Sequence, residues 1–178
     1  VVEERKNLYV PSFTCATLFW GYSMCATAGW GITPRPMYPA DGGKILDSYT
    51  QPRDLRETIK RELGEFPFPT CWGPMAGSGA TQWIVDSVRW IEQKYRPNLN
   101  LVYLPYLDYD LQKFGPSSGA AAKAARTMDD LLCALPDFLE RAGVTPIAVS
   151  EYGLSDAPRT VALHRPFRAR GPTTLTPD

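Results

Sequence analysis

The sequence predicts an α/β fold: a mostly parallel sheet flanked by helices on both faces. Two observations support this prediction. Apolar runs typical of buried strands alternate with segments of helical periodicity, which is the pattern of βαβ units. The 178 residues are also enough for one domain with a substantial core. We therefore expect residues 1–178 to form a single α/β domain.

The first strand is predicted at residues 13–20, where the run FTCATLFW is rich in aromatic and β-branched residues. Glycine and proline then dominate residues 21–52, with four glycines and three prolines in GWGITPRPMYPADGGK. Because proline fixes the backbone and glycine frees it, we expect an ordered loop or lid here rather than a regular element. Such a long loop either contributes to a substrate-binding wall or simply covers the core.

Two helices with clear apolar stripes follow this segment. Residues 52–64 place Leu55, Ile59 and Leu63 on one face, with Gly64 as the stop signal. Residues 80–97 place Ile84, Val88, Ile91 and Tyr95 on one face, and Pro97 ends the helix. A short strand is expected between the two helices, at residues 70–72.

The remaining elements continue the alternation. Residues 98–108 form a nearly continuous apolar run, typical of a parallel strand that is covered on both faces. A helix is expected over residues 120–143 with a break at Pro136, then a strand over residues 144–153 and a helix that begins near Pro158.

Composition excludes several classes of protein. Lys plus Arg and Asp plus Glu number 19 each, so the net charge is zero, which argues against binding of a nucleic acid polymer. The four cysteines show no CxxC spacing and only one histidine exists, His164, so no zinc finger is expected. No apolar run is long enough to span a membrane, and the first ten residues do not resemble a signal peptide. A cytoplasmic location is therefore favoured.

Two carboxylates follow predicted parallel strands. Asp108 ends LVYLPYLD, and Glu151 ends VTPIAVSE. In parallel sheets the strand ends meet at one edge, where ligands bind. Two carboxylates that lie close together repel unless a proton or a cation sits between them, so a divalent metal is one explanation. The alternative is that each acid caps a following helix or turn.

At these residues the sequence resembles a known family. LVYLPYLDYDLQKFGP is similar to the segment of the alkaline phosphatase superfamily that carries an Asp-x-x-x-His metal-binding pair, most closely in its type I phosphodiesterase/nucleotide pyrophosphatase branch. VSEYG lies where that branch has Ser-Asp-His-Gly. GITPRPMYPADGGK is very similar to a sequence segment of a bacterial subgroup of the superfamily.

The resemblance implies a set of metal ligands at matching positions. Asp108 matches the Asp of the first motif, and Gln112 stands at its His position. Glu151 stands at the Asp position of the second motif, and Tyr152 at its His position. The implied cofactor is a divalent metal (zinc, manganese or magnesium), and the loss of both imidazoles favours the harder ions.

The implied function is metal-dependent hydrolysis of phosphate mono- or diesters, with a small-molecule phosphate ester as substrate. Arg35 and Tyr38 are candidates to bind the phosphate group or to stack on a base of the substrate. By resemblance, the nucleophile and further metal ligands lie outside this chain, so no catalytic residue is assigned here. We expect the chain to be an incomplete, central part of a larger catalytic domain, inactive alone and partnered by the remaining segments of the parent protein.

Two other functions remain open. The altered metal motifs would also suit a non-catalytic binding protein or a degenerate homologue on the same fold. A carbohydrate-binding surface built from exposed aromatic residues is a third possibility.

Overall fold

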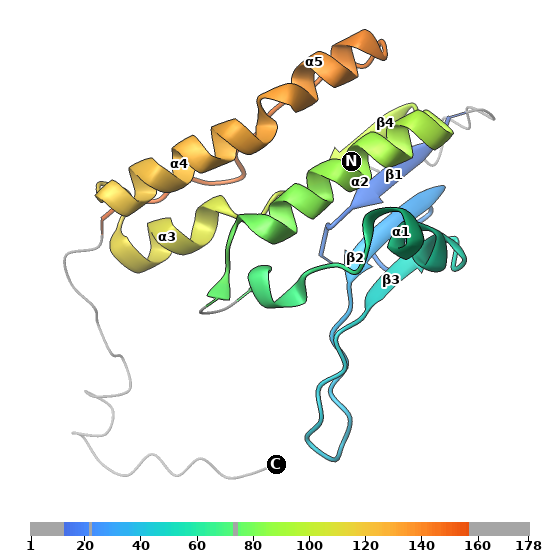
Figure 1. Ribbon diagram of the computed structural model, residues 1–178, viewed down its shortest axis with the longest axis horizontal. Helices are drawn as coiled ribbons and strands as arrows, with labels where there is room; N and C mark the ends of the chain where they lie inside the picture. Colours follow the sequence, from blue (N-terminus) through green and yellow to red (C-terminus); the bar gives the residue numbers. More distant parts are fainter. Residues whose placement is uncertain (1–12, 22, 73–74, 157–178) are drawn as a thin grey trace, which may run out of the picture.

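A computed structural model describes residues 13–21, 23–72 and 75–156. In this part of the chain the fold is α/β (Figure 1). The elements in chain order are β1 (Cys15–Leu18), β2 (Trp30–Pro34), β3 (Ser48–Gln51), α1 (Leu55–Leu63), the 3₁₀ helix η2 (Phe68–Thr70), α2 (Ser78–Tyr95), β4 (Leu99–Val102), α3 (Leu107–Phe114), α4 (Gly119–Leu132) and α5 (Ala134–Arg141).

The four strands of the described chain form one sheet in the order β3-β2-β1-β4. Strand β1 pairs in parallel with β2 and with β4, whereas β2 and β3 are antiparallel. The sheet is therefore mostly parallel, as predicted. The three parallel strands end at the same edge, and the chain leaves that edge at Phe19, Arg35 and Tyr103.

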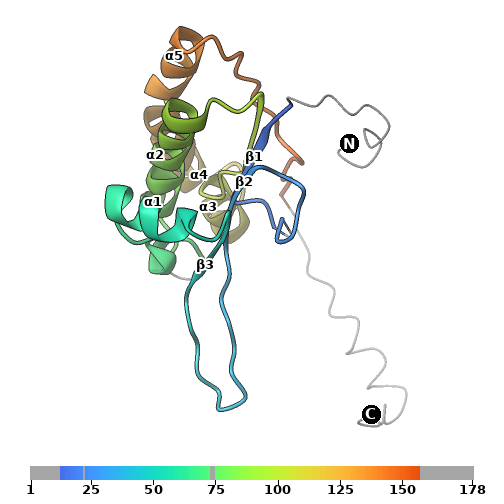
Figure 2. The same cartoon turned by 90° about the vertical axis from the view of Figure 1, so that its right-hand side faces the viewer.

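Helices cover one face of this sheet. Helix α2 packs on β1, α1 packs on β3, and α5 packs on α2. Figure 2 shows α1, α2 and α5 on the same side of the strands. Alternate strand residues point into the core between these layers, and these residues are apolar. Ala16, Leu18 and Ile32 are examples, each 0–1% exposed.

The opposite face of β2 and β3 is covered by the loop between β1 and β2. The backbone N–H of Cys25 donates to the Tyr49 hydroxyl at 3.2 Å, and the Gln51 amide donates to the Ala28 carbonyl at 3.1 Å. Figure 2 shows this loop on the side away from the helices. The prediction that helices flank both faces is thus not confirmed within the described residues.

The predicted stripes of α1 and α2 are confirmed. Leu55 and Ile59 are buried on α1, and Ile84, Val88 and Ile91 are buried on α2, each at 2% exposure or less. Tyr95 ends the α2 stripe, where its ring stacks on Trp30 at a centroid distance of 4.8 Å.

Residues 21–52 differ from the expectation of a loop without regular elements, because they contain β2 and β3. Ile32 and Thr33 favour a strand, and pairing of β2 on both sides outweighs the glycines and prolines around them. Beyond these strands, residues 35–47 continue as a hairpin arm with a bridge between Met37 and Ile45. Figures 1 and 2 show this arm extending away from the helices.

One further expected element is absent, and two others are present with different bounds. Residues 70–72 do not form a strand; Thr70 is the last residue of η2, which has Pro69 in its first turn. The strand predicted at residues 98–108 ends at Val102, and α3 has begun by Leu107. The long helix breaks at Cys133 rather than at Pro136, because a proline is tolerated in the first turn of α5.

The strand predicted at residues 144–153 is also absent. This segment is an exposed coil in which Ile147 and Val149 are 83% and 84% exposed. Pro146 has no N–H to donate to a neighbouring strand, which weakens pairing at this place. The helix predicted near Pro158 lies outside the described residues.

Candidate functional site

The first turn of α3 places Asp108 beyond the end of β4. After β4, the backbone N–H of Tyr103 still donates to the Leu18 carbonyl at 3.0 Å, so the chain remains attached to β1. Pro105 is buried, and α3 starts two residues later. A carboxylate in the first turn of a helix is favoured by the helix dipole. The structure thus places Asp108 half-buried beyond the carboxyl edge of the sheet, the edge at which the sequence predicted it.

The coil after α5 brings Tyr152 to this carboxylate. The Tyr152 hydroxyl donates a hydrogen bond to Asp108 Oδ2, and the Ser150 hydroxyl donates to the Tyr152 carbonyl at 2.7 Å. Figure 1 shows the coil running back along α4 towards α3. Two predicted site residues, 44 positions apart in sequence, are therefore in direct contact.

A second anchor holds this coil at the other end of α3. The Ser117 hydroxyl donates to Asp156 Oδ2 at 2.8 Å. Gly115 lies beside this contact with φ of +83°, and a Cβ atom there would meet Asp156 Oδ1 at 2.8 Å. Glycine is therefore favoured at position 115 by its backbone conformation, and a larger residue would also displace the Asp156 side chain.

Carboxylates and phenols influence one another at this edge. The pKa of Tyr152 is raised from 10.0 to about 12, first by its hydrogen bond to Asp108 and then by burial and by the charges of Asp108 and Glu151. The pKa of Tyr103 is also raised, first by burial and then by the Asp108 and Glu151 charges. Asp108 and Glu151 therefore act on the same phenols, although no direct contact joins them in the described structure.

The donor chemistry decides which metals this edge could accept. In the described part of the chain no group of three or more His, Cys, Asp or Glu residues could hold an ion. Burial raises the pKa of the nearby Cys71 thiol to about 12, which disfavours its thiolate form. The side chains of Asp108, Glu151, Gln112 and Tyr152 offer oxygen donors, which suit magnesium or manganese better than zinc and would need further ligands.

The other predicted residues lie apart from this contact. Gln112 is exposed one turn further along α3 and makes no hydrogen bond to Asp108 within the described structure. Arg35 follows β2, and β1 separates β2 from β4. Tyr38 is 68% exposed on the hairpin arm, with Lys44 Nζ at 5.4 Å from its ring centroid. His164 lies outside the described residues.

Sequence reasoning missed Tyr103, Ser117 and Asp156. Tyr103 was passed over because it lies inside the strand predicted at residues 98–108, whereas β4 ends at Val102. Ser117 and Asp156 carried no signal, since their pairing depends on the path of the coil after α5.

Comparison with known proteins identifies the class of this α/β domain. The family model for type I phosphodiesterase / nucleotide pyrophosphatase matches residues 1–176. The chain therefore belongs to this family, which is part of the alkaline phosphatase superfamily. No curated protein and no solved structure matched the chain significantly.

Within the described residues, no helix is long and apolar enough to cross a membrane.

Proposed function

We propose that the protein containing this chain is a metal-dependent hydrolase of small phosphate mono- or diesters. Its family membership indicates a phosphoester hydrolase. The observation that supports a site in this chain is the contact between Tyr152 and Asp108, which joins the positions of the two metal motifs at the carboxyl edge of the sheet.

Each residue has a distinct proposed role. Asp108 and Glu151 would supply carboxylate oxygens to a hard divalent cation, with Gln112 and Tyr152 beside them. Tyr152, with its pKa of about 12, stays protonated near neutral pH and acts as a hydrogen-bond donor rather than as a base. When bound, the cation would polarise phosphoryl oxygens. Arg35 and Tyr38 would contact the substrate from the β2 side.

A matched pair of variants tests this proposal. Hydrolysis of bis-p-nitrophenyl phosphate and p-nitrophenyl phosphate would be measured with Mg²⁺, Mn²⁺ or Zn²⁺, and again after chelation. We expect Asp108→Asn to lower the metal-dependent rate by at least about tenfold, because one ligand oxygen is lost. Asp110→Asn, two residues along the same helix, removes the same charge and should retain activity. Equal rates in the two variants would remove Asp108 from the site.

A non-catalytic binding protein is the second candidate. Two observations favour it. The described residues contain no cluster of three metal ligands, and the Asp108 carboxylate already accepts a hydrogen bond from the Tyr152 hydroxyl. This function predicts no turnover of either ester with any of the three metals, and no change in melting temperature when a metal is added.

A further inference from the structure

A polar groove lies beside β3, at the base of the hairpin arm. Its volume is about 420 Å³, within the range of small-molecule sites. Three arginines line it, Arg35 after β2, Arg53 before α1 and Arg56 on α1, together with a single carboxylate, that of Asp47. Strand β3 is at the edge of the described sheet, so no further described strand covers this side.

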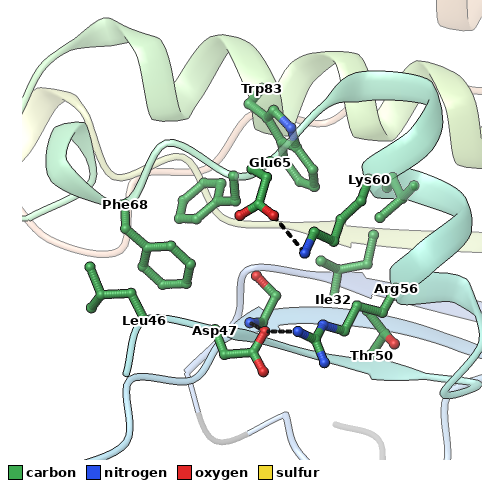
Figure 3. A pocket seen from close by; sticks show the side chains of 12 residues that line it. Ile32, Leu46, Asp47, Thr50, Arg56, Lys60, Glu65, Phe68 and Trp83 are labelled. Atoms are coloured by element: carbon green, nitrogen blue, oxygen red, sulfur yellow. Dashed lines mark hydrogen bonds and ion pairs between the residues drawn. The ribbon is translucent and has the colours of Figure 1, made fainter. Parts of the chain in front are cut away.

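The charge of the groove is unbalanced. Arg56 Nη2 forms an ion pair with Asp47 Oδ1 at 2.8 Å, and Figure 3 shows the Arg56 side chain extending from α1 to this carboxylate. The guanidinium groups of Arg35 and Arg53 make no ion pair or hydrogen bond with other described residues. Arg56 also has Glu57 Oε1 at 3.8 Å from its Nε, so its charge is balanced and those of Arg35 and Arg53 are left without a partner among the described residues. A positive concave surface of this kind attracts anions.

The neighbouring walls limit where a ligand can lie. The Asp47–Arg56 pair is shared with a second pocket, whose other side is formed by apolar residues including Phe68 and Trp83 (Figure 3). That pocket has about 20 Å³, room for about one water molecule, so no organic group fits there. A ligand is therefore confined to the open, positively charged side.

We propose that this groove is an anion site that binds the phosphate group of a phosphorylated small molecule through Arg35 and Arg53. Guanidinium groups bind phosphate oxygens with two parallel hydrogen bonds, which gives both strength and orientation. The Ser48 side chain in the lining adds a hydroxyl for the rest of the ligand. Arg53 is thus a second phosphate contact beside Arg35, and the sequence alone did not suggest it.

The groove lies at the β3 end of the sheet, whereas Asp108 follows β4. Strands β3 and β4 are at opposite ends of the sheet order, three strand spacings or about 14 Å apart, and Arg35, after β2, lies between them. The inference rests on the proposed function only for the choice of phosphate as the ligand chemistry, so its test measures binding rather than turnover.

Isothermal titration calorimetry in the presence of a chelator tests the site in the full-length protein. The probes are AMP and inorganic phosphate, with adenosine as the uncharged comparison. We expect AMP and phosphate to bind, more weakly as salt is added, and adenosine not to bind. Arg35→Gln and Arg53→Gln should each raise the Kd for AMP at least about tenfold.

Arg61→Gln is the matched control, since Arg61 is an exposed arginine of α1 outside the groove. It should change the Kd by less than about twofold. The proposal is overturned if AMP and phosphate show no saturable binding, if adenosine binds as tightly as AMP, or if Arg61→Gln weakens binding as much as the groove variants. Binding that persists in a protein without hydrolytic activity counts against the proposed function alone.

Discussion

At the scale of single residues, Tyr152 and Asp108 define a measurable electrostatic pair. Asp108 accepts the phenol hydrogen bond, and this contact is the largest cause of the raised pKa of Tyr152. We expect Asp108→Asn to lower that pKa from about 12 towards 10.0, because the negative charge that opposes ionisation is removed. NMR titration of ¹³C-labelled tyrosine rings, assigned with Tyr152→Phe, measures the change.

Asp110→Asn serves as the control and should leave the Tyr152 titration where it is. The same pKa gives a sign for stability. Because the folded-state pKa lies above the unfolded value, the pair stabilises the fold fully below pH 10 and loses this effect as the pH rises towards 12. Equal stability of Tyr152→Phe and the unmodified protein at neutral pH would show that the contact contributes nothing to folding.

At the scale of elements, Ser118 starts α4. Its hydroxyl accepts from the Ala121 N–H at 3.1 Å and donates to the Gly115 carbonyl at 2.7 Å. We expect Ser118→Ala to lower the free energy of unfolding by about 1 kcal/mol, because an N-terminal N–H loses its partner. Ser118→Asp keeps the acceptor and should stay close to the original stability. Urea unfolding followed by circular dichroism measures both; equal losses would assign the effect to the Gly115 carbonyl instead.

The elements that could be predicted from sequence are the helices, because the spacing of their apolar residues marks the buried face. The stripes of α1 and α2 show which face is buried whatever lies opposite, so Leu55, Ile59, Ile84 and Ile91 were found. Strands depend on partners far along the chain. Residues 144–153 have a strand-like composition but no described pairing, while β2 lies between β1 and β3 despite the glycines and prolines around it.

At the scale of the whole molecule, the order of the sheet decides which predicted site residues meet. The rule that parallel strands end at one edge was enough to select Asp108. It could not show that Tyr152 would reach it from a coil, or that β1 would separate Arg35 from Asp108. Those facts depend on strand order and on the path of the chain after α5, and local composition determines neither of them.

The difference in burial between the helix–sheet core and the coil after α5 predicts where loss of an apolar side chain destabilises the molecule. Ile84 of α2 is 0% exposed in the layer between helices and sheet, whereas Ile147 is 83% exposed in the coil after α5. We expect Ile84→Ala to lower the free energy of unfolding by about 2–5 kcal/mol, through lost burial and a cavity. The identical substitution at Ile147 should change it by less than about 0.5 kcal/mol.

Urea unfolding monitored by tryptophan fluorescence compares the two variants. If Ile84→Ala does not fold, Ile84→Val gives the same comparison at a cost of about 0.5–1.5 kcal/mol. A loss at Ile147 as large as that at Ile84 would contradict the exposed coil, because only a side chain packed in a core layer is stabilised to that extent.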